Sequence, residues 1–138
     1  MFVLAVAANW FLLAARSGLA RAQLVMGLNY ANGRGVPCDA AQAVSWLRLA
    51  AEQGLGRAQY NLGVILGGGM GVAKDLIEAV MWLSQAALRG EYRADDARKF
   101  YSRQMSAEEI AQARRRSREW VTHRQPAAAP ELKRRALP

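Results

Sequence analysis

The sequence predicts an all-α protein built from a helical unit that repeats along the chain. Three observations carry this prediction. Residues of the same type recur at an offset of 36 positions, apolar residues within each copy fall at helical spacing, and glycines or helix-capping residues separate the apolar runs. A period of this length is typical of a solenoid, in which each unit packs on its neighbours. We therefore expect about seven helices, which are justified below in chain order.

Three tryptophans mark successive copies of the unit. Trp10, Trp46 and Trp82 each lie 36 residues from the next, and alanines and a closing glycine recur around them in the same register. Each tryptophan lies on the second helix of its unit among these alanines, so we interpret all three as core residues. The copies divide the chain into a partial repeat 1–18, full repeats 19–54 and 55–90, and a partial repeat 91–105.

Turn and capping residues place the helices within these repeats. The first helix ends before Gly18, and later helices are expected at about 20–31, 40–53, 56–66 and 75–88 and from about residue 92. Gly33 and Gly35 suit a turn that needs positive φ. Asp39 and Asp75 each have the chemistry of an N-cap, because a carboxylate can accept the unpaired N–H groups of a first turn.

Two glycines lie in the middle of helices rather than in turns. Gly27 and Gly63 occupy equivalent positions, and each costs about 1 kcal/mol of helix stability relative to alanine. A close approach between the two helices of a unit would explain why both copies keep the glycine.

The repeat pattern ends within the partial repeat 91–105. Ser106 and Glu109 form a capping-box pattern that opens a helix over residues 106–122. We interpret this segment as a capping helix whose apolar stripe, including Trp120, covers the end of the solenoid. Residues 123–138 lack an apolar period and are predicted to form a disordered basic tail.

The composition limits the function classes. Cys38 is the only cysteine and His123 the only histidine, so we expect no internal disulfide, no metal site of the Cys/His type, no other cofactor and no catalytic dyad. The apolar opening, Phe2 to Ala15, is shorter than the roughly 20 residues that span a bilayer. It also lacks a charged leading region, so we expect no transmembrane segment and favour the cytoplasm. A signal peptide, and with it a periplasmic location, is kept as an alternative.

The spacing of the first full repeat resembles a known family. The residues that carry the resemblance are Ala22, Met26, Gly27, Tyr30, Gly33, Gly35, Val36, Asp39, Ala43, Trp46, Ala50, Ala51 and Gly54. This pattern closely resembles the Sel-1-like repeat, a branch of the tetratricopeptide-like α-solenoids, and the resemblance extends from about Ala7 to Ala97. It implies a right-handed superhelical solenoid of antiparallel helix pairs that serves as a non-enzymatic bacterial adaptor. Some cysteine-rich relatives are associated with β-lactam binding or hydrolysis, but their cysteine pairs are absent here.

The first helix of each unit lines the concave side in this architecture, and it carries the candidate site. Opposite the Ala-Gly packing face of this helix, the residues at positions i, i+3 and i+7 form a stripe. The residue at position i is an arginine in every copy. The residues of the stripe are Arg21, Leu24, Leu28, Arg57, Tyr60, Val64, Arg93, Asp96 and Phe100. Arginines over an apolar and aromatic floor would suit an acidic, partly hydrophobic protein or peptide partner. In the alternative interpretation, the arginines are merely solvated and the apolar residues are packed.

Two further alternatives stay open. The net charge of +8 is concentrated in residues 89–138, where thirteen Lys/Arg face seven Asp/Glu. A basic accessory protein could therefore contact nucleic acid or an anionic membrane surface through the Arg-rich C-terminal helix and tail, although we expect a protein partner instead. The truncated first repeat leaves room for a homodimer that buries the exposed end, or for a longer parent chain.

Overall fold

The computed structural model describes the backbone of residues 2–135 and the side chains of residues 6, 7 and 9–123. Within these residues all regular secondary structure is helical and there is no strand, which confirms the all-α prediction. The helices are α1 (Phe2–Arg16), α2 (Ala20–Asn32), α3 (Ala40–Glu52), α4 (Gly56–Gly68), α5 (Leu76–Leu88), α6 (Tyr92–Ser102) and α7 (Ala107–Arg135). Their number also agrees with the predicted seven.

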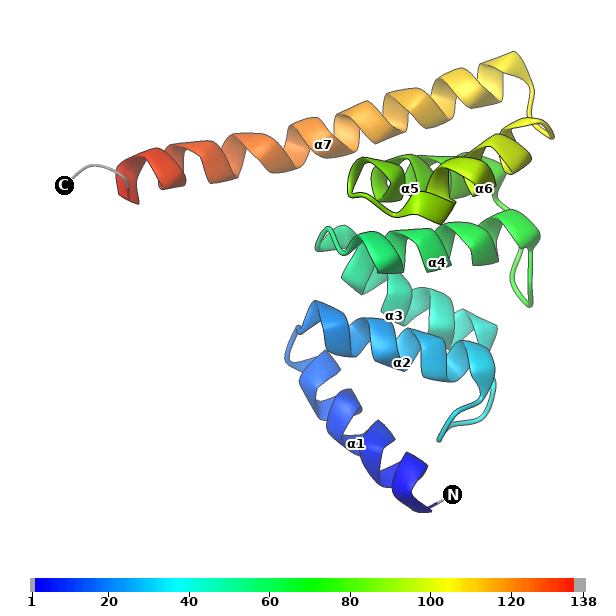
Figure 1. Ribbon diagram of the computed structural model, residues 1–138, viewed down its shortest axis with the longest axis vertical. Helices are drawn as coiled ribbons and strands as arrows, with labels where there is room; N and C mark the ends of the chain where they lie inside the picture. Colours follow the sequence, from blue (N-terminus) through cyan, green and yellow to red (C-terminus); the bar gives the residue numbers. More distant parts are fainter. Residues whose placement is uncertain (1, 136–138) are drawn as a thin grey trace.

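The helices stack in chain order into a solenoid. Figure 1 shows α1 to α6 following one another along the long axis of the molecule, with α7 crossing the far end. Helix α2 packs on α3 and α4 packs on α5, and the contacts of α3 with α4 and of α5 with α6 join successive units. The first helices of the units are therefore α2, α4 and α6, and the second helices are α1, α3 and α5.

A close approach within each unit explains the two mid-helix glycines. A Cβ atom at Gly27 would lie 2.6 Å from Cγ of Leu47, and one at Gly63 would lie 2.7 Å from Cγ of Leu83. Both distances are shorter than van der Waals contact, so no side chain fits at either position without displacing a neighbour. The predicted reason for keeping these glycines is confirmed.

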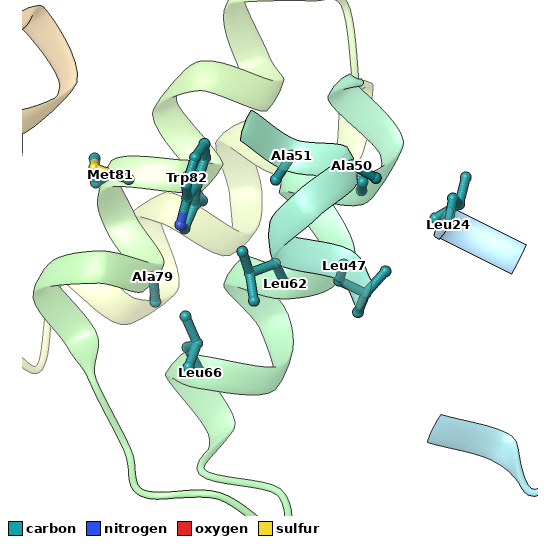
Figure 2. Packing of buried hydrophobic residues seen from close by; sticks show 10 residues of the cluster. Leu24, Leu47, Ala50, Ala51, Leu62, Leu66, Ala79, Met81 and Trp82 are labelled. Atoms are coloured by element: carbon teal, nitrogen blue, oxygen red, sulfur yellow. The ribbon is translucent and has the colours of Figure 1, made fainter. Parts of the chain in front are cut away.

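The core lies between the helix pairs. Leu62 of α4 and Leu47 of α3 are fully buried, and Figure 2 shows Leu62 among Leu47, Ala79 and Trp82. Trp82 is 3% exposed, as the repeat register predicts. Alternating large and small side chains let the helices of successive units interlock.

The core assignment of the first tryptophan is wrong. Trp10 is 71% exposed, whereas Trp46 packs, partly buried, against the cluster that contains Met26. The physical reason is that a second helix is covered by the first helix of its own unit, and the described chain places no helix before α1.

Capping residues begin the second helices as predicted. A side-chain oxygen of Asp39 accepts a hydrogen bond from the N–H of Gln42 at 3.1 Å, and Asp75 accepts one from the N–H of Glu78 at 3.0 Å. The C-caps of α2 and α4 are the left-handed glycines Gly33 and Gly69. These caps explain why the helices begin and end close to the predicted residues.

A repeated glutamine connects each unit to the one before it. The side-chain amide of Gln23 donates to the carbonyl of Ala15 at 3.3 Å, and that of Gln59 donates to the carbonyl of Ala51 at 3.1 Å. Both glutamines are buried. Asp95 lies 36 residues after Gln59, and an ionised carboxylate cannot donate the same bond. The connection is therefore lost in the third unit.

Helix α7 begins at the predicted capping box and extends further than predicted. Ser106 and Glu109 exchange side-chain to backbone hydrogen bonds of 3.1 and 3.0 Å. The helix continues to Arg135, where the sequence predicted a capping helix ending at 122 and a disordered basic tail over 123–138. This segment contains an alanine run, and alanine has the highest helix propensity. Its side chains from residue 124 onward lie outside the described residues.

Candidate protein-interaction surface

A groove follows the exposed side of the first helices. It consists of two hollows of about 430 and 480 Å³ that share Leu28 of α2 and Asn61 of α4 as lining residues. The first hollow reaches the start of α6 at Tyr92, and the second reaches the loop residue Cys38. Because the hollows share two lining residues, we treat them as one surface and call it the first-helix groove.

Five of the nine predicted partner-binding residues line this groove. Leu28, Arg57, Tyr60 and Arg93 line the first hollow, and Leu28 and Val64 line the second. Arg57 and Arg93 are exposed, whereas Leu28, Tyr60 and Val64 are partly buried. The stacking of α2, α4 and α6 thus brings together residues far apart in the chain.

The other four predicted residues lie elsewhere. Arg21 and Asp96 are exposed but line neither hollow. Phe100 is 57% exposed and contacts the ring of Tyr101 edge-on at a centroid distance of 5.2 Å. Leu24 is only 8% exposed and belongs to the core cluster with Leu47, so its side chain offers little surface to a partner.

The groove contains an exposed aromatic residue that the sequence reasoning missed. Tyr92 is 77% exposed, and its hydroxyl accepts a hydrogen bond from Nε of Arg93 at 2.9 Å. The Arg93 guanidinium also lies 5.4 Å from the centre of the Tyr92 ring. The hydrogen bond with Tyr92 raises the pKa of Arg93 above its ordinary value. An aromatic residue directly before an arginine was the signal available in the sequence.

Two polar residues complete the first hollow. Asn61 donates a hydrogen bond of 2.8 Å to the carbonyl of Arg57, which holds the amide against its own helix. Glu91 adds one carboxylate to the residues that line the hollow. The groove therefore offers two guanidinium groups, an amide and two tyrosine rings over aliphatic side chains. This combination can bind carboxylates and apolar groups at the same time.

The groove contains little that points to covalent chemistry. The thiol of Cys38 is exposed and donates to the carbonyl of Ala31 at 3.4 Å, and none of the residues that line the two hollows is a histidine. Across the described residues, no group of three or more His, Cys, Asp and Glu side chains is placed to hold a metal ion. None of the described helices is both long enough and apolar enough to cross a membrane.

Comparison with known proteins places the chain in a family. The Sel1 repeat matches residues 4–19, 20–55 and 56–91, which together are more than half of the chain. No curated protein matches the sequence.

Solved structures agree with this match. The crystal structure of c5321, described as a protective antigen of uropathogenic Escherichia coli with an SLR fold, is similar over 96% of this chain with a TM-score of 0.81 and 32% identity. A Sel1 repeat protein from Oxalobacter formigenes is similar over 65% of this chain with a TM-score of 0.63 and 39% identity. The chain spans 28% and 37% of the lengths of these two proteins. Together with the 36-residue unit and its glycine-mediated helix packing, these matches show that the chain belongs to the Sel1 repeat family.

Proposed function

We propose that the chain is a non-enzymatic interaction module whose first-helix groove binds an acidic, partly hydrophobic segment of a protein partner. The observation that carries this proposal is the convergence of Arg57, Tyr60 and Arg93 on one hollow, although they come from two different units. The Sel1 repeat family, whose fold is typically a scaffold for protein interactions, supports the same conclusion.

The chemistry of the groove favours this class of partner. Arginine and tyrosine are the side chains that most often dominate the energy of protein interfaces, because they combine a large contact area with directed hydrogen bonds. Arg57, Arg93 and Glu91 all line this hollow. An acidic segment would pair with the arginines, and the carboxylate of Glu91 would disfavour an acidic residue at one place in the hollow.

The test is a selection of peptides from a randomised display library on the immobilised full chain. We expect enriched peptides to carry Asp or Glu next to an aromatic or aliphatic residue. Their affinity is then measured by fluorescence polarisation with the wild-type chain and with the double variant Arg57→Glu, Tyr60→Ala. The variant should lose at least about tenfold in affinity, since hot-spot residues each contribute roughly 2 kcal/mol.

The repeat supplies a matched control. Arg21 lies 36 residues before Arg57 and is also exposed, but it lines neither hollow. Arg21→Glu should therefore bind the selected peptides like the wild-type chain, and circular dichroism should show unchanged helix content in both variants. Equal affinity of the wild type and the double variant would refute the groove, and enrichment of basic peptides would refute the proposed chemistry.

A further inference from the structure

A second groove lies at the C-terminal end of the solenoid. It consists of two hollows of about 540 and 260 Å³, and both are lined by Ser84 of α5, Arg98 of α6 and Arg114 of α7. We call it the α6–α7 groove. It shares no lining residue with the first-helix groove.

The groove exists because α6 and α7 do not pack as a pair. In the two full units the first and second helices pack on each other, whereas α6 and α7 both pack on α5. Ser117 anchors α7, since Gln85 donates hydrogen bonds to its carbonyl at 2.9 Å and to its hydroxyl at 2.7 Å. Figure 1 shows α7 crossing beyond the α5 and α6 layer. The space between the two helices therefore follows from the packing of each of them on α5.

The substitution of the repeated glutamine shapes this space. Asp95 lines the larger hollow, where the earlier units have a buried glutamine bonded to the preceding unit. The Asp95 carboxylate turns instead to its own helix, where it accepts a hydrogen bond from Arg98 at 2.7 Å and pairs with Lys99 at 3.0 Å. The ion pairs hold these two cations on the α6 wall.

The walls of the groove are strongly basic. Its cationic lining residues are Arg98, Lys99, Arg103, Arg114 and Arg118. Asp95 is the only carboxylate among the lining residues. Arg114 and Arg118 are exposed, lie one turn apart on α7, and have no ion-pair partner among the described residues. Their charges are available to an acidic partner.

The floor of the groove is apolar. Val80, Ala87 and Leu88 of α5 and Ile110 of α7 line it, and Leu88 is 74% exposed. A phosphate group or a nucleic-acid backbone would pair with the basic walls but would leave this floor without a contact. A helix that is apolar on one face and acidic at its flanks would contact both.

We propose that the α6–α7 groove binds an acidic amphipathic helix of a partner protein. The apolar face of this helix lies on the exposed Leu88 and the partly buried Ile110, and its carboxylates pair with Arg114 and Arg118 on one side and with Arg98 on the other. This surface is separate from the first-helix groove, so the two can engage different segments.

The test uses the full chain and a fluorescein-labelled synthetic peptide with leucines on one helical face and glutamates on the flanks. Three competitors are measured beside it: a scrambled peptide of the same composition, the same peptide with lysines for glutamates, and a single-stranded oligonucleotide of equal charge. We expect the amphipathic acidic peptide to bind most tightly. Tighter binding of the oligonucleotide, or equal binding of the scrambled peptide, would overturn the proposal.

Variants of α7 locate the site. Arg114→Glu with Arg118→Glu should reduce affinity for the acidic peptide at least about tenfold, because two attractive contacts become repulsive. Arg115→Glu with Arg116→Glu is the matched control, since these exposed arginines lie on the same helix but do not line the groove. The control should change affinity less than about twofold, as expected for screened charges outside the contact. Equal losses in the two variants would show unspecific attraction and refute the site.

Two further measurements keep the result clear. If the glutamate variant loses helix content, Arg114→Gln with Arg118→Gln replaces it and is compared with the same change at Arg115 and Arg116. The variant Arg57→Glu should lose clearly less affinity for the acidic peptide than the α7 variant, because Arg57 lies in the other groove and affects only the share of peptide that binds there. A loss in Arg57→Glu as large as that in the α7 variant would place the peptide there instead and refute the assignment.

Discussion

The most direct test of the packing is an alanine in place of Gly63. The added Cβ would lie 2.7 Å from Cγ and 3.0 Å from Cδ2 of Leu83, and 3.1 Å from the carbonyl oxygen of Ala79. Leu83 is fully buried, and the carbonyl belongs to the backbone of α5. Neither neighbour can move away without disturbing the contact between α4 and α5.

The expected loss of stability follows from two opposing effects. Alanine in mid-helix stabilises by about 1 kcal/mol relative to glycine. Overpacking a well-filled core costs about 1–3 kcal/mol, and the backbone contact at Ala79 places Gly63→Ala at the upper end of that range. The net change is a loss of about 2 kcal/mol in the free energy of unfolding, which for a chain of this size lowers Tm by roughly 6 °C.

Thermal unfolding followed by circular dichroism measures this change, with Gly68→Ala as the control on the same helix. A Cβ at Gly68 would meet only the flexible side chain of Met70, at 3.3 Å, and Met70 is 54% exposed. The control should therefore unfold at or above the wild-type temperature. An increase of Tm in Gly63→Ala would contradict the conclusion that close helix approach explains the glycine.

Two further predictions concern polar contacts between and within units. Gln23→Leu should destabilise the fold by about 1 kcal/mol more than Gln59→Leu, as measured by urea unfolding. The reason is that Gln23 accepts a 2.7 Å hydrogen bond from Gln53, whereas the buried side-chain oxygen of Gln59 has no partner. Equal losses of stability in the two variants would refute this prediction. The hydrogen bond from Arg98, together with Lys99, lowers the pKa of Asp95 below its ordinary value of 3.8. The ionised carboxylate therefore contributes stability well above pH 3.8 that is lost as the pH falls through the lowered pKa. A wild-type chain that exceeds Asp95→Asn in stability equally at pH 7 and at pH 2 would contradict this sign.

Much of the fold followed from the repeat register. The predicted helix over 40–53 is Ala40–Glu52, and the one over 20–31 is Ala20–Asn32. These bounds were predictable because caps and turns are local chemistry: a carboxylate accepts the free N–H groups of a first turn, and a glycine takes the left-handed conformation at a helix end.

The residues that were misplaced depend on what covers them rather than on local chemistry. Trp10 has the register of a core residue but is exposed, because no preceding helix lies over it in the described chain. Leu24 was assigned to the surface stripe but lies in the core, since a stripe with steps of three and four residues also touches the edge of the packed face. Periodicity predicts which residues share a helix face, whereas the burial of a residue depends on which helix packs over that face.

The features missed in the candidate site share one property, which is that they interrupt the repeat. Tyr92 occupies the position of Gly56 one unit earlier, and Asp95 occupies that of Gln59. A buried residue that is the same in every unit preserves the contact between helices, so it cannot distinguish one end of the solenoid from the other. Tyr92 adds an exposed ring to the first-helix groove, and Asp95 removes a link between units and faces the α6–α7 groove. Each of the two proposed binding surfaces therefore contains a departure from the repeat in the third unit.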